Sequence, residues 1–360
     1  MGHYLNTENY LDIYPYEVLD EQVKHHLENL DILDRVQFSG TFYKKSQLPQ
    51  LKKALQKTYN ELILRNKSVQ LRFYGFTDTP FDMDWIADLT EIECLEIESW
   101  SEILHIEKLA DFKNLKKLHL SFGLKMKGDL SFLTKINPNL EVLYIRTEEK
   151  KPKVDLMPVT HFKNLKELWV MYLENNLENA LAELPHLQKL RLRSISKPQT
   201  LDFIKHLTDL QHLNLELCSF SDVSAIGELK NLRSLNLFRL LKVEDLSFLS
   251  DLQQLTFIEL DSMSNLHTLP RFTKLKNNCE IKINSCKKIT DFTALADSTM
   301  IKAISITTAP NLSTEQYILI LQNPHIEYVS IYTESAKRNT ELNDLAQKFG
   351  KKPYRERYQH

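Results

Sequence analysis

Histidine and cysteine are the side chains of this chain that could act as a general base, a nucleophile or a metal ligand. There are twelve histidines and four cysteines in 360 residues. His119 and His212 have no cysteine or serine at a consistent spacing that could serve as their nucleophile. Cys279 and Cys286 have no partner pair at zinc-finger spacing, and the glycine-rich phosphate loops, HExxH and GxSxG are absent. The sequence therefore predicts a protein that is not an enzyme and has no metal site or cofactor.

The elements that must position any other functional side chain follow a repeat. From Ile92 the pattern apolar-x-x-apolar-x-apolar recurs ten times, with a weaker copy at Ile281 and Ile283, at steps of 22 to 25 residues. The ten copies are Ile92/Leu95/Ile97, Leu115/Leu118/Leu120, Leu140/Leu143/Ile145, Leu165/Leu168/Val170, Leu187/Leu190/Leu192, Leu210/Leu213/Leu215, Leu232/Leu235/Leu237, Leu255/Ile258/Leu260, Ile301/Ile304/Ile306 and Ile326/Val329/Ile331. The last two apolar residues of each copy have the spacing of a short strand, so both point to one side. Such a sustained register indicates a stacked-repeat architecture.

This pattern resembles the leucine-rich repeat over residues 67–333, and the return segments 221–232 and 243–252 resemble short bacterial units of the internalin type. The resemblance implies an α/β solenoid, a leucine-rich-repeat horseshoe with about eleven to twelve parallel strands on its concave face. The family consensus places asparagine or cysteine three residues after the last leucine. No asparagine occupies that position here, and only Cys218 and Cys286 fit it. We therefore expect less uniform turns, in which water or other side chains make those hydrogen bonds.

The ends of the chain lack the repeat and are predicted to cap it, because a solenoid otherwise exposes its first and last apolar layers. We expect an N-terminal helical and strand cap over 1–66, the repeat over 67–333, and a C-terminal capping helix with a basic tail over 334–360. Apolar spacing predicts helices over 16–30, 47–62 and 335–349 and strands over 36–42 and 69–73. The tail from Lys351 to His360 is predicted to be a solvated terminus.

Composition favours a cytoplasmic protein. The net charge of −2, with 26% charged residues, argues against a generic nucleic-acid surface. No apolar stretch approaches the roughly 18 residues that span a bilayer, and the first residues have no secretory pattern. Four cysteines form no disulfide framework and are expected to be reduced thiols.

The candidate binding residues are those that should point outward from the strands, opposite the apolar pair. Two groups of aromatic, arginine, methionine and polar side chains gather there, and the first three of these types are enriched at interface centres. The first group is Tyr144, Arg146, Trp169, Met171, Tyr172, Arg191 and Arg193, and the second is Asn236, Phe238, Arg239 and Phe257. The alternative is that these aromatic residues pack on one another across strands and merely cover the sheet.

These residues predict a non-enzymatic scaffold that binds another protein or an extended peptide, with an acidic or mixed patch on the partner and no small-molecule substrate. One narrower hypothesis is a bacterial immunity or antitoxin-type protein that blocks a toxin, and another is an adaptor or regulatory subunit of a cellular enzyme. A nucleic-acid binder would use Arg146, Arg191, Arg193 and the basic tail, but acids interspersed on the same face argue against it. Those acids are Glu216, Glu259 and Asp261.

Overall fold

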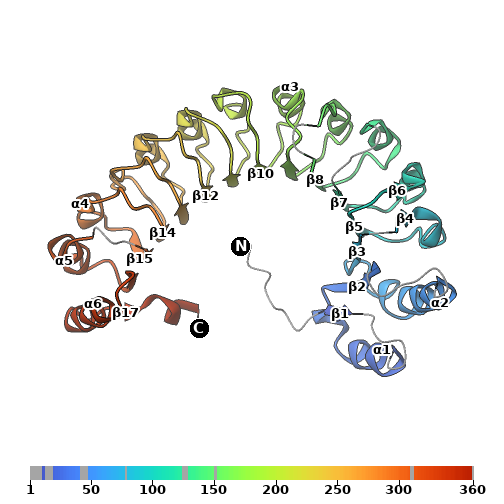
Figure 1. Cartoon of the computed structure of the whole chain (residues 1–360), viewed down its shortest axis with the longest axis horizontal. Helices are drawn as coiled ribbons and strands as arrows, with labels where there is room; N and C mark the ends of the chain where they lie inside the picture. The colour runs from blue at the N-terminus through green and yellow to red at the C-terminus, as the bar shows by residue number, and fades with distance from the viewer. Residues whose placement is uncertain are drawn as a thin grey trace. The chain divides into compact units, whose positions relative to one another are not determined.

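The computed structural model describes residues 10–12, 19–40, 48–77, 79–123, 129–149, 152–308 and 312–358. The chain divides into two compact units, Met1–Leu184 and Pro185–His360. In each unit the strands form a parallel sheet, with the helices and the return segments on one side of it (Figure 1). We call the other side of each sheet its outward face.

Among its described residues, the first unit builds its sheet from seven strands, each paired in parallel with the next. They are β1 (Tyr10–Asp12), β2 (Arg35–Ser39), β3 (Gln70–Phe76), β5 (Cys94–Ser99), β7 (Lys117–Phe122), β8 (Val142–Thr147) and β9 (Glu167–Met171). A separate two-stranded sheet joins β4 (Phe81–Asp82) and β6 (Ile103–Leu104). The helices are α1 (Leu19–Glu28), α2 (Leu48–Thr58) and α3 (Leu177–Ala182).

The part of the second unit that the structure describes builds its sheet from eight strands. They are β10 (Lys189–Arg193), β11 (His212–Glu216), β12 (Ser234–Phe238), β13 (Phe257–Asp261), β14 (Cys279–Asn284), β15 (Ile301–Thr307), β16 (Tyr328–Tyr332) and β17 (Lys352–Pro353). Its helices are α4 (Thr293–Ala296), α5 (Thr314–Gln322) and α6 (Ala336–Lys348). The two units together hold more strands than the expected eleven to twelve, because β1, β2 and β17 lie outside the repeat pattern.

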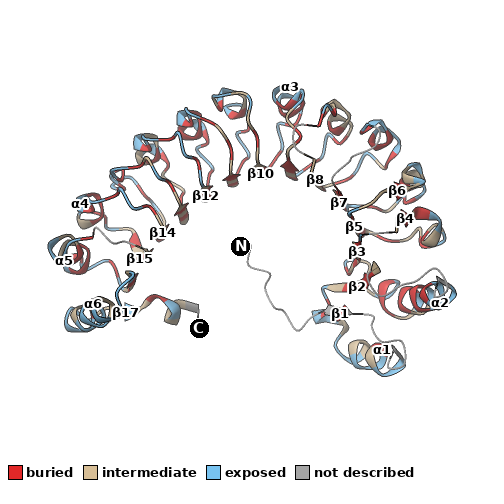
Figure 2. Ribbon diagram, in the orientation of Figure 1, coloured by how far each residue is buried: buried red, intermediate tan, exposed pale blue. Residues whose placement is uncertain are grey.

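The apolar pair of each copy faces inward, as the period of two predicts. Leu235 and Leu237 are 0% exposed, whereas Asn236 between them is half-buried on the outward face. Leu235 lies in register with Leu213 on β11 and Ile258 on β13, so the inward residues form continuous apolar columns. In Figure 2 the buried residues of the strands and of the return segments are coloured red.

Most turns after the strands use a left-handed backbone residue in place of the missing asparagine. Positive φ occurs at Tyr172, Ser194, Leu217, Arg239, Ser262, Ser285 and Thr308, each directly before the consensus asparagine position. The N–H groups of Ser194, Leu217, Arg239, Ser262 and Ser285 donate to the last residue of the next strand at 2.8 to 2.9 Å. The backbone therefore satisfies itself at these turns.

The consensus position that follows is consequently buried and mostly apolar. Leu173, Ile195, Leu240 and Met263 are 0% exposed there. Cys218 and Cys286 are also buried, and their thiols donate to the carbonyls of Leu192 and Leu260 in the preceding unit of the repeat, at 3.4 and 3.5 Å. Burial raises the pKa of Cys218 to about 12 and that of Cys286 to about 11. Both thiols therefore belong to the core of the repeat.

Aspartate opens many of the return segments. Asp129, Asp155, Asp222, Asp245 and Asp291 each accept the backbone N–H two residues later at 2.8 to 2.9 Å. The bond from the N–H of Ser224 lowers the pKa of Asp222, and the bond from the N–H of Thr293 lowers the pKa of Asp291. Each bond favours the charged form of the carboxylate. The sequence reasoning missed this signal, which is Asp-x-Ser/Thr in four of the five cases.

The helices at the two ends lie close to their predicted ranges. Residues 16–18 and 47 lie outside the described residues, and the second helix ends earlier than expected, where a turn of π-helix covers Tyr59–Ile63. Ser335 accepts the N–H of Arg338 and so caps α6. Phe349, the residue that follows α6, is 40% exposed. No helix in the described ranges combines the length and the apolar content that a bilayer crossing requires.

The expectation of a solvated tail is wrong for residues 351–358. Lys352 and Pro353 form β17 and pair in parallel with Tyr328 and Val329 of β16. A 3-10 helix, Tyr354–Tyr358, follows, and Tyr354 is only 8% exposed. The tail thus extends the second sheet and covers part of its outward face.

The strand register can be tested with a matched pair of substitutions. Leu235→Asp places an unpaired carboxylate in the apolar column and should lower the free energy of unfolding by more than about 3 kcal/mol. Asn236→Ala removes one half-buried hydrogen bond, from its Nδ2 to Glu259 at 2.8 Å, and should cost about 1 kcal/mol. Denaturant unfolding measures both. Equal losses would contradict the register.

Candidate binding face

The first predicted group is divided between the two units. Tyr144, Arg146, Trp169, Met171 and Tyr172 lie in the first unit, and Arg191 and Arg193 lie in the second. Each part makes its own set of contacts. The second predicted group lies wholly in the second unit.

A row of rings crosses the outward face of the first unit. His119, Tyr144 and Trp169 are register partners on β7, β8 and β9. The rings of His119 and Tyr144 stack with centroids 4.0 Å apart, and Tyr144 meets Trp169 edge to face at 5.4 Å. The guanidinium of Arg146 lies 5.9 Å from the centre of the Trp169 ring. The parallel register therefore turns a column in the sequence into a continuous aromatic surface.

Charges of opposite sign alternate beside this row. Arg72 contacts Glu96 at 3.2 Å and Glu98 at 2.8 Å, and Arg146 contacts Glu98 at 2.7 Å. Burial by itself would raise the pKa of Glu96, but the neighbouring His119, whose Nδ1 lies 3.8 Å from the carboxylate, and the charge of Arg72 bring that pKa below its ordinary value. The arginine charge expected to attract an acidic partner is thus already balanced within the sheet.

Two residues of the first group differ from the prediction, Met171 in its exposure and Tyr172 in its backbone conformation. Met171 is only 7% exposed, so it supports the face more than it offers contact area. Tyr172 has φ of 63° and belongs to the turn after β9, not to the strand. Both were expected to continue the outward alternation, which ends where the chain enters the left-handed turn.

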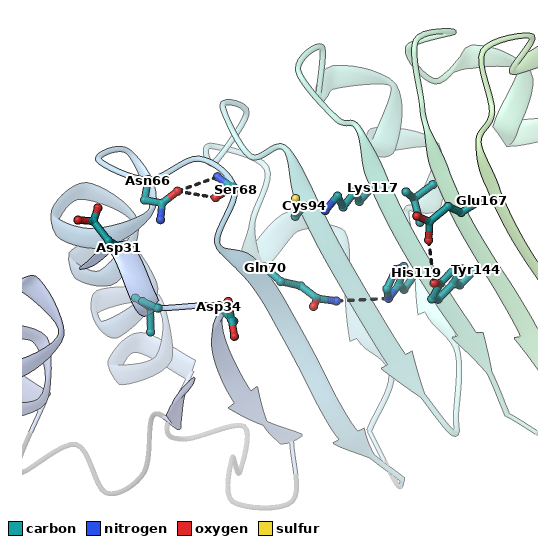
Figure 3. Close-up of a pocket in the computed structure, with 12 residues that line it drawn as sticks. Asp31, Asp34, Asn66, Ser68, Gln70, Cys94, Lys117, His119, Tyr144 and Glu167 are labelled. Carbon is teal, nitrogen blue, oxygen red and sulfur yellow. Dashed lines mark hydrogen bonds between the residues drawn. The ribbon is translucent and has the colours of Figure 1, made fainter. Parts of the chain in front are cut away.

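A depression of about 330 Å³ lies beside the row of rings, at the amino ends of the strands (Figure 3). Its walls include Asp34 after α1, Gln70 on β3, Lys117 and His119 on β7, and Tyr144 on β8. The sequence reasoning missed this hollow because it treated 1–66 only as a cap. The sequence held one sign of it, the residue that directly precedes the inward apolar pair on each strand. In neighbouring strands these residues are Gln70, Cys94, Lys117, Val142 and Glu167.

The hollow is poorly suited to nucleophilic chemistry. Its thiol, Cys94, is 4% exposed, and burial raises the pKa of that thiol. The Nδ1 atom of His119 lies 3.3 Å from the amide nitrogen of Gln70, and the Tyr144 hydroxyl donates to Glu167 at 3.3 Å. The polar groups of the hollow therefore orient one another and offer hydrogen bonds to a ligand.

Glu216 organises the part of the outward face that holds Arg191 and Arg193. Its carboxylate is 2.7 Å from each guanidinium, one oxygen to each arginine, and the residue is 6% exposed. Sequence reasoning treated Glu216 only as a neighbouring acid. A nearly buried carboxylate shared by two arginines instead fixes both side chains in place.

The second predicted group forms a more open surface. Asn236 donates to Glu259, which also accepts from Asn284 at 3.2 Å. Phe238 and Phe257 are half-buried, and the ammonium of Lys282 lies 5.3 Å from the centre of the Phe257 ring. Arg239 is exposed and occupies a left-handed turn.

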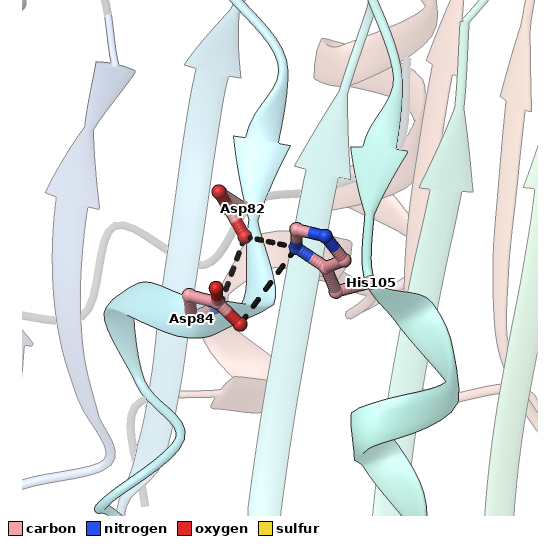
Figure 4. Close-up of side chains that lie close together, drawn as sticks. All are labelled: Asp82, Asp84 and His105. Carbon is pink, nitrogen blue, oxygen red and sulfur yellow. Dashed lines mark hydrogen bonds and ion pairs between the residues drawn. The ribbon is translucent and has the colours of Figure 1, made fainter.

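One further cluster, away from the outward face, has metal-ligand chemistry: Asp82, Asp84 and His105 in the first unit (Figure 4). Asp82 accepts from the Nδ1 of His105 at 2.9 Å and from the N–H of Asp84 at 3.0 Å. Asp84 also forms an ion pair with Lys108. These carboxylates already hold two cationic side chains, so we assign the cluster to joining neighbouring repeats.

This cluster predicts a pH dependence of stability. The hydrogen bond to Asp82 and the charge of Asp84 raise the pKa of His105. The folded protein then binds this proton more tightly than the unfolded chain, so the stabilisation is full below about pH 6.5 and is lost as the pH rises through the folded value. Unfolding measured between pH 5.5 and 8.5 should show this loss in the parent and not in His105→Gln or Asp82→Asn. Parallel profiles would refute it.

The contacts of Glu216 with two arginines predict that replacing this glutamate lowers the free energy of unfolding markedly. Glu216→Ala removes the carboxylate that both arginines contact, and it should cost about 2 kcal/mol, reduced from the fully buried case because the arginines are one-third exposed. Glu259→Ala, which removes two hydrogen bonds from amides, serves as the control and should cost about 1 kcal/mol. Chemical denaturation distinguishes the two. A smaller loss for Glu216→Ala than for Glu259→Ala would contradict the structural role.

No protein-family model matches the sequence, and no curated protein matches it. Solved structures do share its fold. An internalin from Listeria monocytogenes aligns with a TM-score of 0.52 and 16% identity over 90% of each chain. A leucine-rich-repeat protein of Leptospira interrogans aligns with a TM-score of 0.44 and 17% identity, covering 88% of this chain and 89% of that one.

A chain from the Toll–Spätzle complex of Drosophila aligns with a TM-score of 0.50 and 14% identity, covering 86% of this chain and 42% of that one. At these identities the likeness concerns the fold. The repeat pattern, the parallel sheets and the internalin alignment agree, and the chain has the leucine-rich-repeat fold, an α/β solenoid.

Proposed function

We propose that this protein is a non-enzymatic scaffold that binds another protein, or an extended peptide, through the outward face of its repeat sheet. The observation that carries the proposal is the row of His119, Tyr144 and Trp169, flanked by paired charges. The contacts across strands hold these rings in place before a partner arrives, so little side-chain entropy is lost on binding. The fold match to a chain of the Toll–Spätzle complex is in line with a protein-binding role.

The charge pattern favours a partner with a mixed polar and apolar surface. Arg146 pairs with Glu98, and Arg191 and Arg193 pair with Glu216, so these arginines do not form a bare positive patch. Interspersed charges of both signs contribute to partner specificity and binding register more than to raw affinity. The same feature disfavours a nucleic-acid backbone as the ligand.

Blocking of a toxin is the narrower role that we propose. Occluding another protein's active surface needs a rigid, shaped face and no catalytic group, and the outward face offers such a surface. We also place this role in the cytoplasm. All four cysteines are buried and free of disulfides, as is usual in a reducing compartment.

The proposal is tested by capture and substitution. Immobilised protein is exposed to the native cytosol of its source, and the retained partner is identified by mass. Its affinity is then measured for the parent and for Trp169→Ala, which should weaken binding by about 2 kcal/mol or more, the scale of an aromatic anchor. Inhibition of a retained toxin by the parent protein supports toxin blocking, whereas a retained enzyme that stays active on the scaffold indicates an adaptor.

Trp100→Ala is the matched control, because Trp100 also lies in the first unit and is 46% exposed, but follows the strand end. It should leave the affinity nearly unchanged. A loss of affinity with Trp100→Ala and none with Trp169→Ala would place the binding site at the strand ends and not on the outward face.

A further inference from the structure

The tail of the chain rests on the outward face of the second unit. Lys351 anchors its base by donating to the carbonyls of Asn323 and Ile326, both at 2.7 Å. The N–H of Tyr354 donates to the Ser330 hydroxyl of β16 at 3.0 Å. The 3-10 helix Tyr354–Tyr358 then runs over the strand side of the sheet, where Figure 1 shows the described end of the chain.

The tip of the tail meets a buried acid. Glu280 is on β14, in the outward column that also holds Phe257 of β13, and it is 3% exposed. Arg357 of the tail forms an ion pair with its carboxylate, and Lys282 lies 3.8 Å from the same group. A carboxylate this buried is costly unless cations and hydrogen bonds compensate for its lost hydration.

An aromatic contact accompanies this ion pair. The ammonium of Lys282 contacts two rings, 5.6 Å from the centre of Tyr354 and 5.3 Å from that of Phe257. The tail therefore presents a guanidinium to Glu280 and a ring to Lys282. Arginine and tyrosine are also the residues that most often anchor one protein on another.

We propose that Glu280 and Lys282 form a recognition site for a segment that carries an arginine near an aromatic ring, and that the tail is its resident occupant. This inference rests on the proposed function and specifies the partner's chemistry at the second unit. A partner's arginine replaces Arg357, so one guanidinium takes the place of another at the buried carboxylate. Exchange of this kind keeps a guanidinium at the Glu280 carboxylate, whereas removal of the tail with no replacement takes away one of the two cations that the carboxylate contacts.

The exchange predicts that the tail weakens the apparent affinity of any competing segment. A tethered occupant acts at a high effective concentration, and the free ligand binds only the fraction of molecules whose tail has left. Loosening the tail should therefore tighten binding of an added segment without any new contact.

The probe is a fluorescent peptide with the sequence of residues 351–358, added to the full-length protein and followed by anisotropy. We expect Arg357→Ala to bind it about tenfold more tightly than the parent, because the resident arginine is gone. Arg355→Ala is the matched control, since Arg355 is in the same turn but exposed, and it should bind as the parent does. Adding Glu280→Gln to Arg357→Ala should abolish the gain.

The peptide itself has a control, in which alanine stands at the position of Arg357 and which should not bind. Circular dichroism checks folding, and Arg357→Lys replaces Arg357→Ala in the comparison if the latter does not fold. Equal binding by the parent and the Arg357 variant, or binding of the alanine peptide, would overturn the proposal. That result would leave the Trp169 test untouched, since Trp169 lies in the other unit.

Discussion

The stacking of inward apolar pairs is the interaction on which the rest of the structure depends. A single strand with two apolar residues cannot bury them alone, so each copy requires a neighbour in register. Leu213, Leu235 and Ile258 illustrate this, because each fills the same column on consecutive strands. Once the register of that column is fixed, each strand ends at an equivalent residue, so the turns recur in the same place. The outward residues of consecutive strands then lie in register as well.

The turns show how the same constraint is met with different residues. A consensus asparagine would satisfy backbone groups through its side chain. In this chain a left-handed residue brings its own N–H to the neighbouring strand, and the freed position is filled by Leu240, Met263 or a thiol such as Cys218. Apolar residues thus take the place of the asparagine side chains and add to the core. This explains why the strand register is kept without asparagine.

The sequence was sufficient to predict the architecture, because its period of 22 to 25 residues and its period of two are both direct consequences of packing. It also predicted that Tyr144, Arg146 and Trp169 lie together, since neighbours in a column are neighbours in space. It did not predict the charge balance, because the partners Glu98 and Glu216 depend on side-chain reach across strands. The docked tail was missed because its anchors, Lys351 and Arg357, contact residues 25 or more positions away.

Parallel columns are also the physical reason why we propose the outward face as the binding surface. Strands about 4.8 Å apart force each outward side chain against its neighbours, so isolated charges are destabilising and opposite charges or stacked rings are favoured. The result is a surface whose rotamers are set before binding, as with His119 stacked on Tyr144 and Glu216 between two arginines. If the proposed function holds, the order of side chains along these columns sets which partner fits the face. The tail follows the same rule, because its arginine and tyrosine meet the acid and the lysine that β14 already presents.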